Sequence, residues 1–556
     1  MAILESRSER ARPQTADRTA AAPAAARGEW RFVGAIAIVA LVLTAAPYVF
    51  ARVTAPTDKQ FVGLALNVPD HIQYFSWMRD LSTRNLASDR LTPEPNEPAL
   101  FNLLWWLTGR IGVVTGFDYA ALHTLLRLLS LPLLLGCAYA FVRLVVTDPQ
   151  RRRAAFVLFV FGGGLGIVWI AVKYLARLPE APFPFDIYTS EPNTFINLLA
   201  FPHFSIALAL IIATFGLLLV ALKCRQWSYA VASGLVALVL GLQHTYDLVT
   251  IYAVLGLFGL LTWLRDRRFP AFLFGCGALL VGISAPPALY SFLLVKQSPL
   301  WGEVLAQFDL AGAFTPNPLH LPILLGVPAL LAIAAFRPRM LQSRSDAEMF
   351  VAAWFVAHLP LVYLPVDFQI HLLLGWQMPI AILAAEGLAR VAPAIAARVR
   401  IRPAAVAAGL IGLALITNGY VLLWRFIELS RYEAPYFMSR DDAAALDWLA
   451  RNATSQDVVL ASLDFGQWVP TWSDARAYVA HWTGTLDFLD KRDAAEAFVE
   501  GRLGEPEQKL LLDEYRVTYV VHGAQDGSSG IDALGRSPRL SPAFSRGNTI
   551  VYRVGN

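Results

Sequence analysis

The stretch 33-VGAIAIVALVLTAAPYVF-50 decides the fold class, because it runs for eighteen residues without a charged side chain. An apolar helix of about twenty residues can cross the roughly 30 Å hydrocarbon core of a bilayer. The whole chain agrees: of its 556 residues 56% are hydrophobic and 16% are charged, and the mean hydropathy is +0.49. Soluble proteins of this length do not have such a composition. The sequence predicts an α-helical polytopic membrane protein, with this stretch as a retained anchor or, alternatively, a cleaved signal peptide.

Further apolar runs of comparable length follow along the chain. Each can be read as a span by the same rule, which brings the predicted number of transmembrane helices to about eleven. The ten further spans are expected near 118–146, 154–175, 196–222, 228–244, 247–264, 270–294, 319–336, 347–365, 371–390 and 403–426.

Short basic clusters between these runs predict the orientation of the chain. Lys and Arg gather in the cytoplasmic loops of polytopic membrane proteins. With the N-terminus inside, all five clusters fall on cytoplasmic loops: 148-DPQRRR-153, 223-KCR-225, 265-RDRR-268, 337-RPRMLQSR-344 and 398-RVRIR-402. We expect a multi-pass protein of the inner (plasma) membrane. The net charge of +4 is modest and gives no support to a nucleic-acid partner.

The two ends of the chain differ in kind from its apolar middle. Residues 1–30 are rich in Ala, Arg and Pro and predict a disordered cytoplasmic tail. Residues 31–428 form the predicted membrane domain, with a first outer loop at 52–117. An odd number of spans then places residues 429–556 on the extracytoplasmic side.

This C-terminal segment predicts a small α/β domain, because amphipathic helical patterns alternate with short apolar strands. It has no GxGxxG or GxxxxGK loop, so nucleotide binding has no support. Ser473 in this domain and Arg344 in a basic loop should be reached from opposite sides of the membrane. Helices are expected at 441–453 and from 506, and strands at 457–462, 476–481, up to 523 and at 549–554.

The loops predicted outside hold acids, histidines and aromatics, whereas those predicted inside are short and basic. Ionisable groups near membrane depth are costly and tend to be functional. The first outer loop contains 68-VPDHIQYFSWMRD-80, and the second contains 183-FPFDIYTSEPNTFINLLAFPHFS-205. The turn 243-QHTYD-247 and the loop 366-VDFQIH-371 follow. This asymmetry predicts a functional site on the outer face.

The first outer loop also contains 97-EPALFNLLWWLTGRIGVVTGFDYAALHTLLRLLS-130. An acid soon after the first span, followed by such a stretch, resembles the start of the GT-C membrane glycosyltransferases, which include protein O-mannosyltransferases and bacterial aminoarabinose transferases. The many-span body and the outer C-terminal domain resemble that superfamily as well. The residues that match its juxtamembrane helix are Pro98, Trp105, Trp106, Gly109, Gly116 and Arg127.

The resemblance implies a glycosyltransferase that moves a hexosyl or pentosyl group from a polyprenyl-phosphate donor to an extracytoplasmic lipid, glycan or protein. Such a displacement requires a carboxylate that accepts the proton of the acceptor, and groups that stabilise the departing phosphate. Asp70 lies at the position of the family's acid and is the candidate general base. The alternative is that Asp70 caps a helix over 71–81, since an Asp before a helix accepts hydrogen bonds from its free N–H groups.

Candidate substrate-binding residues lie near Asp70. His71 could hydrogen-bond a sugar or a phosphate, or be a polar interface residue. Tyr74, one turn after Asp70, could stack on a sugar ring or anchor the helix at the membrane interface. Glu191 could pair with Asp70 around a divalent cation, as in the oligosaccharyltransferase branch of the superfamily, or lie at a helix N-terminus without a function. His203 follows Glu191 into the next span.

The remaining candidates lie in or beside other spans. His244, Tyr246 and Asp247 join two spans with almost no loop, so they must face the outer cavity or pair with one another. The stretch 366-VDFQIHLLLGWQMPIAIL-383 resembles a late outer loop of related bacterial transferases, and its candidate binding residues are Gln369 and His371.

Two basic side chains could hold a lipid phosphate. Arg127 offers a bidentate fork and Lys173 a point charge. The alternatives are an interhelical ion pair for Arg127 and snorkelling for Lys173, whose long stem lets the ammonium group reach the interface.

Two other functions compete with glycosyl transfer. A transporter or lipid flippase would use broken spans such as 161-FGGGLG-166 and 284-SAPP-287, although we see no inverted repeats. A non-catalytic cell-envelope scaffold would use an exposed aromatic cluster such as 463-LDFGQWVPTW-472, but it leaves the polar outer loops unexplained.

Overall fold

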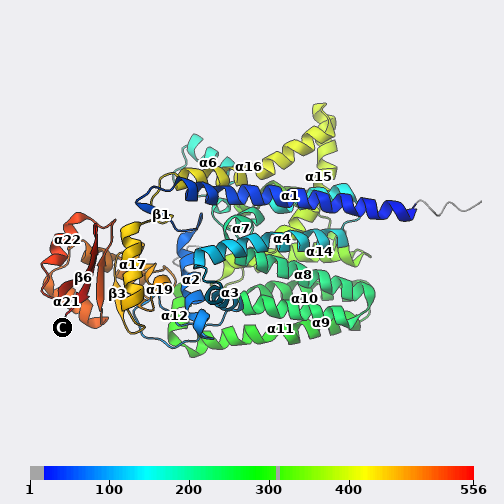
Figure 1. The fold of residues 1–556 in the computed structure, drawn as a ribbon. Coiled ribbons are helices and arrows are strands. Elements are labelled where there is room, and N and C mark those ends of the chain that lie inside the picture. The colour runs from blue at the N-terminus through cyan, green and yellow to red at the C-terminus, as the bar shows by residue number, and fades with distance from the viewer. Residues whose placement is uncertain (1–17, 308–313, 556) are drawn as a thin grey trace, which may run out of the picture.

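The computed structural model describes residues 18–307 and 314–555. Long helices lie side by side in a bundle, and a small sheet with its own helices joins one end of that bundle (Figure 1). This arrangement confirms the predicted class: a helical multi-pass membrane protein with a small C-terminal α/β region. Residues 1–17 of the predicted tail lie outside the described residues, whereas residues 18–30 belong to helix α1.

The helices α2 (Val68–Thr83) and α3 (Leu103–Thr115) lie between the bundle and the sheet (Figure 1). The other helices before residue 430 build the bundle. In chain order the latter are α1 (Arg18–Thr54), α4 (Tyr119–Val145), α5 (Pro149–Phe161), α6 (Gly166–Leu175), η1 (Phe185–Ile187), α7 (Thr194–Ala200), α8 (Pro202–Cys224), α9 (Trp227–Gln243), α10 (Asp247–Asp266), α11 (Ala271–Gln297), α12 (Pro299–Ala306), α13 (Leu321–Ala335), η3 (Pro338–Gln342), α14 (Asp346–Leu361), η4 (Gln369–Leu373), α15 (Gln377–Val399) and α16 (Pro403–Leu429).

Seven helices of the described residues are long and apolar enough to cross a membrane, or eight if the bent pair α5 and α6 is one span. The predicted number of about eleven is therefore not confirmed. The physical reason is length: α9, α13 and α14 occupy three predicted spans but contain 17, 15 and 16 residues. At 1.5 Å per residue they are about 23–26 Å long, which is shorter than the roughly 30 Å hydrocarbon core.

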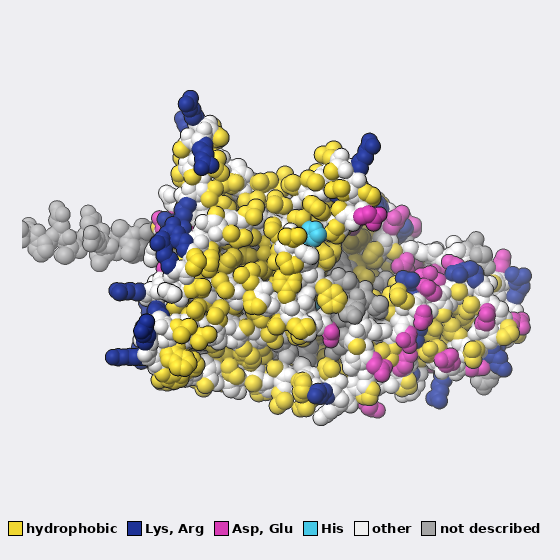
Figure 2. Space-filling view, turned by 180° about the vertical axis from the view of Figure 1, so that it is seen from behind, with side chains coloured by type: hydrophobic (Ala, Val, Ile, Leu, Met, Phe, Trp, Pro, Cys, Tyr) yellow, Lys and Arg dark blue, Asp and Glu magenta, His cyan; other side chains and the backbone are white. Residues whose placement is uncertain are grey.

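The basic clusters lie where helices of the bundle begin or end. Arg225, Arg267 and Arg400 follow α8, α10 and α15 with φ between 51° and 57°, so each ends its helix in the left-handed conformation. Lys and Arg side chains gather at the bundle end away from the C-terminal domain, and a broad hydrophobic band separates them from the acidic side chains near that domain (Figure 2). The charge distribution favours the predicted orientation.

The glycine-rich stretch 161-FGGGLG-166 bends the chain by 56° between α5 and α6. A second break lies opposite it in α13, where Gly326 has φ +63°. A Cβ atom on Gly326 would lie 2.3 Å from the Gly163 carbonyl oxygen, so only glycine fits this backbone contact.

The C-terminal domain follows a two-stranded link to the first outer loop, in which β1 (Lys59–Phe61) pairs antiparallel with β2 (Phe437–Ser439). Its five-stranded sheet has the order β4-β3-β5-β7-β6, with β4, β3 and β5 parallel and the other pairs antiparallel. Its elements are α17 (Arg440–Asn452), β3 (Val458–Leu460), α18 (Leu463–Gly466), α19 (Val469–Trp472), β4 (Arg476–Ala477), α20 (Phe488–Val499), α21 (Glu505–Glu514), β5 (Tyr519–His522), α22 (Ser528–Gly535), β6 (Leu540–Arg546) and β7 (Thr549–Val554).

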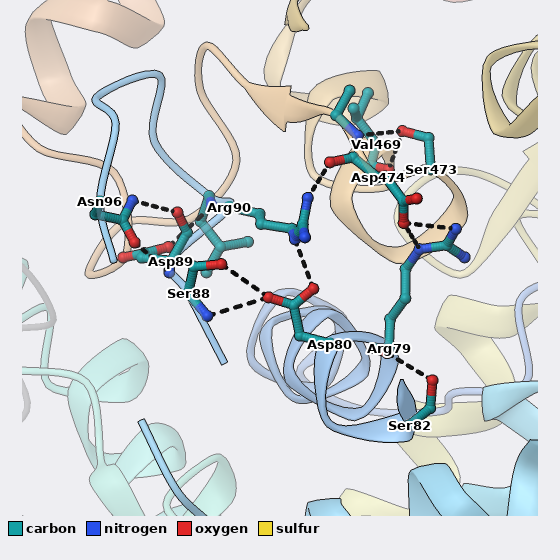
Figure 3. A network of polar contacts seen from close by, with 12 residues as sticks. Arg79, Asp80, Ser82, Ser88, Asp89, Arg90, Asn96, Val469, Ser473 and Asp474 are labelled. Atoms are coloured by element: carbon teal, nitrogen blue, oxygen red, sulfur yellow. Dashed lines mark hydrogen bonds and ion pairs between the residues drawn. The ribbon is translucent and has the colours of Figure 1, made fainter. Parts of the chain in front are cut away.

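The first outer loop, which contains α2 (Val68–Thr83) and α3 (Leu103–Thr115), packs directly on this domain. Asp80 of α2 forms an ion pair with Arg90 at 2.7 Å, and both side chains are only 4% exposed. Arg90 also donates to the backbone carbonyl of Asp474, and Arg79 pairs with the Asp474 carboxylate at 3.1 Å. The two arginines therefore reach the same turn of the C-terminal domain (Figure 3), and loop and domain form one unit.

The orientation can be tested by cysteine labelling in a variant whose three native cysteines are replaced by alanine. Ser473 is buried, so the exposed Lys509 is a better position in the same domain. We expect Lys509→Cys and Arg344→Cys to react with an impermeant maleimide from opposite sides of the membrane, as read by gel shift on intact and lysed cells. A variant that keeps only the exposed native Cys224 should behave like Arg344→Cys. Labelling of all three from one side would contradict the predicted orientation.

The buried Asp89 predicts a pH-dependent stability. Burial raises the pKa of Asp89 to about 7. A hydrogen bond from the Leu91 N–H opposes this increase, and the negative charge of Glu94 adds to it. An unfolded Asp has a pKa of about 4, so between these values only the folded chain holds the proton, and the free energy of unfolding falls as pH rises. Asp89→Asn should therefore raise Tm by a few degrees more at pH 8 than at pH 4.5.

Scanning fluorimetry in detergent at both pH values measures this difference. The matched control is Asp118→Asn, which changes an exposed Asp of the same loop. Equal changes in Tm at the two pH values for Asp89→Asn would show that the Asp89 carboxyl does not titrate in this window.

Candidate functional site

Helix α2 presents Asp70 where the bundle, the first outer loop and the C-terminal domain meet. The helix begins at Val68 after Asn67, whose φ of 47° and ψ of 56° set the chain direction into it. Asp70 is therefore the third helical residue and not the cap, which differs from the predicted helix start at His71. An acid in the first turn is still favoured by the helix dipole.

The Asp70 carboxylate accepts hydrogen bonds from two parts of the chain. One oxygen accepts from the side-chain amide of Asn67, and the other lies 3.2 Å from Nε2 of His481 in the C-terminal domain. Burial raises the pKa of Asp70, but these two contacts and the neighbouring His71 outweigh burial and hold the pKa below its usual value. The side chain is 22% exposed, so the ionised carboxylate can be reached by a ligand.

His71 fastens α2 to the bundle. Its Nδ1 lies 2.7 Å from the Asn67 carbonyl oxygen and its Nε2 lies 2.8 Å from that of Ala200, at the end of α7. Burial lowers the pKa of His71, although the two carbonyl groups and the charge of Asp70 act to raise it. Because both ring nitrogens already face acceptors, this imidazole positions the helix that carries Asp70.

Tyr74 and Trp105 form an aromatic wall one turn below Asp70. Their rings stack with centroids 5.0 Å apart and planes 18° apart. Burial raises the pKa of Tyr74 well above its usual value, and the charges of Asp70 and Glu191 raise it further. The Tyr74 hydroxyl therefore stays protonated and lies within electrostatic reach of both carboxylates.

His203 continues the wall into the bundle. It is the second residue of α8, and its ring lies 4.8 Å from that of Tyr74 and 5.9 Å from that of His244. The side chain is only 4% exposed, and neither ring nitrogen has a hydrogen-bond partner among the described residues. Buried imidazole nitrogens of this kind are available to a ligand.

His244, Tyr246 and Asp247 pair with one another, which is one of the two arrangements expected for this turn. His244 Nδ1 lies 2.6 Å from the Asp247 carboxylate, and His244 Nε2 lies 2.7 Å from the Tyr246 hydroxyl. An arrangement in which Nδ1–H donates to the Asp247 carboxyl group leaves Nε2 as the acceptor of the Tyr246 hydroxyl.

Glu191 and His371 complete the cluster from two other loops. Glu191 Oε1 lies 2.7 Å from His371 Nδ1, and the His371 ring stacks on Tyr246 at 4.6 Å. Gln377 at the start of α15 donates to the Glu191 carbonyl oxygen at 2.9 Å, which holds the two loops together. The structure thus brings eight predicted residues into one cluster: Asp70, His71, Tyr74, Glu191, His203, His244, Asp247 and His371.

The other three predicted binding residues make contacts elsewhere. Arg127 lies inside the bundle, where its guanidinium group stacks over Tyr48 at 4.2 Å and donates to the Thr44 carbonyl oxygen at 3.2 Å. Lys173 donates to the Pro179 carbonyl oxygen at 2.7 Å and so closes the loop after α6. Gln369 joins two loops, because it accepts from the Thr315 N–H at 3.0 Å and donates to the Leu364 carbonyl oxygen at 2.9 Å.

A divalent cation was a possible partner of Asp70 and Glu191. Within residues 18–307 and 314–555, no three His, Cys, Asp or Glu side chains converge on a point that could hold a metal ion. The residues present therefore do not form a metal site in this conformation, and we derive no step through a metal.

Sequence reasoning did not identify His481 and Asn67, the two contacts of the Asp70 carboxylate. Asn67 directly precedes the quoted acidic stretch, and an Asn before a Val-Pro helix start is a recognisable signal for a helix entry. His481 is separated from Asp70 by 411 positions, and the sequence around it indicates only the end of a short strand.

Comparisons with known proteins find similar structures but no similar sequences. No family model and no curated protein matches this sequence. The oligosaccharyltransferase AglB of Archaeoglobus fulgidus, solved with an inhibitory peptide and a dolichol-phosphate, is similar in structure, with a TM-score of 0.52 and 13% sequence identity. The match covers 88% of this chain and 69% of the AglB chain. An Archaeoglobus fulgidus oligosaccharyltransferase tethered through a disulfide bond to an acceptor peptide with an NVT sequon has a TM-score of 0.51 at 13% identity. The match covers 88% of this chain and 68% of the oligosaccharyltransferase chain.

ArnT of Cupriavidus metallidurans in the apo state is also similar, with a TM-score of 0.48 and 13% sequence identity. This match covers 95% of the present chain and 98% of the ArnT chain. The fold assignment rests on the archaeal oligosaccharyltransferase structures. The chain shares its fold with these oligosaccharyltransferase structures over most of its length.

Proposed function

We propose that this protein is a membrane glycosyltransferase that moves a sugar from a polyprenyl-phosphate donor to an acceptor, with Asp70 as the general base. The observation that carries the proposal is the Asp70 carboxylate: partly exposed, held by two hydrogen bonds, and next to an aromatic wall at one end of a GT-C bundle. The fold supports this function over a transporter or a scaffold, because the similar structures are oligosaccharyltransferases.

The chemistry assigns a role to each part of the cluster. Asp70 takes the proton of the acceptor hydroxyl or amide while the acceptor atom forms its bond to the anomeric carbon. The bond from that carbon to the phosphate oxygen breaks, and its electron pair leaves with the phosphate. Tyr74, whose ring is stacked on the buried Trp105, offers its ring to a sugar.

His203 is our candidate ligand for the sugar or for the departing phosphate. Neither ring nitrogen has a partner in the described part of the chain, and the ring lies close to those of Tyr74 and His244. Hydrogen-bond donors aimed at developing negative charge stabilise a transition state. Arg127 and Lys173 were the basic candidates for this task, but their contacts place them in a helix packing site and in a loop. We therefore propose that imidazole groups replace basic side chains at the phosphate.

Two observations support a lipid-linked donor. AglB was solved with a dolichol-phosphate, and by analogy we propose a polyprenyl-phosphate sugar here, with a lipid, glycan or protein as the acceptor. The C-terminal domain has no nucleotide-binding loop, which supports a lipid-linked donor. By the predicted orientation, transfer takes place outside the cytoplasm.

Asp70→Asn tests the general base. The amide keeps the size of the side chain and can still accept from His481, but it cannot take the acceptor proton. Turnover should fall by roughly 10²–10⁴-fold, the range for removal of acid–base help. The measurement is sugar transfer by purified protein in lipid, with Tm recorded alongside.

The matched control is Asp89→Asn, which makes the same change in a buried Asp of the same loop and should keep the activity. A folded Asp70→Asn protein with near wild-type turnover would remove Asp70 from the mechanism, and Glu191 would become the next candidate.

A further inference from the structure

His481 is the one contact of the Asp70 carboxylate that comes from the C-terminal domain among the described residues. Its side chain is 3% exposed and lies in the turn after β4. The Thr485 hydroxyl holds this turn together, because it accepts hydrogen bonds from the N–H groups of Ala480 at 3.0 Å and His481 at 3.2 Å. The same hydroxyl donates to the Leu91 carbonyl oxygen at 2.5 Å, which ties the turn to the first outer loop. The imidazole is therefore held rigidly with respect to the first outer loop.

The neighbours of the ring determine which nitrogen carries the proton. The backbone N–H of Thr483 lies 3.2 Å from Nδ1 of His481, and the Thr483 hydroxyl lies 2.9 Å from the same atom. A backbone N–H can only donate, so Nδ1 is an acceptor without a proton. The proton of the neutral ring is consequently on Nε2, and Nε2–H donates to Asp70.

The other groups around the carboxylate do not replace this donor. Asn67 serves the second oxygen, and both ring nitrogens of His71 face backbone carbonyl groups. Tyr74 is a neutral phenol one turn away. His481 therefore fixes the direction of the Asp70 oxygen that it contacts, and it leaves a lone pair of the carboxylate for an incoming proton.

We propose that His481 is a positioning residue for the general base: the C-terminal domain supplies the N–H that orients Asp70 and keeps it ionised for proton transfer. The inference rests on the proposed function and deepens it. In the transfer step the acceptor proton moves to an Asp70 oxygen, the new glycosidic bond forms, and the electron pair of the broken C–O bond leaves on the phosphate. His481 keeps its own proton throughout, so it orients the base without being a catalytic acid.

Three variants test this role. His481→Phe keeps a ring and loses the donor, whereas His481→Gln places an amide N–H near the position of Nε2. The control is Asp474→Asn, which removes the negative charge of the exposed ion pair with Arg79 between the same two parts of the chain and does not touch Asp70. Sugar transfer from a polyprenyl-phosphate sugar is measured from pH 4 to pH 9, with kcat and KM determined separately.

We expect His481→Phe to lower kcat by roughly 10- to 100-fold, the factor for losing a hydrogen bond to a charged group, with little change in KM. Without this donor the pKa of Asp70 rises, so the acid limb of the pH profile should move to higher pH. His481→Gln should recover most of the rate and of the profile, and Asp474→Asn should match the wild type. A purely structural role would lower the rate equally at all pH values, and that result, or a wild-type profile for His481→Phe, would overturn the proposal.

Asp70→Asn separates this inference from the proposed function. If Asp70→Asn remains active, the general base is wrong and the proposed mechanism fails. If Asp70→Asn is inactive while His481→Phe keeps the wild-type profile, only the role of His481 fails. A double-variant cycle of Tm checks the contact without any substrate: the losses of Asp70→Ala and His481→Phe should not add, because each of these changes removes the same interaction. Additive losses would show that the two side chains do not pair.

Discussion

The buried ion pair between Asp80 and Arg90 lies within the first outer loop and orients Arg90, which donates to the Asp474 carbonyl oxygen and so joins the loop to the C-terminal domain. The arrangement of the candidate site depends on this pair. Two charges that are only 4% exposed lose most of their hydration, so such a pair is stable only when further hydrogen bonds satisfy it. Ser88 supplies its N–H and hydroxyl to Asp80, at 3.1 and 2.9 Å, and Arg90 also reaches the Asp474 carbonyl oxygen. The network holds α2 against the turn that precedes β4. His481 lies in the turn that follows the same strand, and Asp70 lies on α2.

The candidate site is consequently a product of three parts of the chain. The outer loop contributes Asp70 and Tyr74, the bundle contributes His203, and the C-terminal domain contributes His481. The C-terminal domain is therefore not a separate module, because its His481 contacts Asp70 in the site. This explains why the domain packs on α2 through a shared hydrophobic core instead of extending on a linker.

Much of the fold could be predicted from the sequence, because membrane length and composition impose strong constraints. The span at 33–50 lies inside a helix at Gly28–Thr54, and the strand at 549–554 is β7. The number of spans could not be predicted, since an apolar run such as 319–336 does not reveal that Gly326 breaks its helix. The strand β6 (Leu540–Arg546) was missed because most of its side chains are exposed, so no apolar pattern indicates it.

The same distinction applies to the site. Asp70 and the other cluster members could be found because acids and histidines are rare beside apolar runs. Arg127 was a reasonable phosphate ligand by that criterion, yet its guanidinium group stacks over the ring of Tyr48 inside the bundle. His481 could not be found, because a contact across 411 positions depends on the packing of the whole domain.

The most direct test of the central claim is transfer of a labelled sugar by the purified wild-type protein from a panel of polyprenyl-phosphate sugars, with nucleotide sugars tested in parallel in lipid free of polyprenyl phosphate. The proposed function predicts that at least one lipid-linked sugar is consumed, with release of polyprenyl phosphate, and that no nucleotide sugar serves as a direct donor. Turnover of a nucleotide sugar alone, or a folded protein that consumes no lipid-linked sugar in the panel, would contradict it.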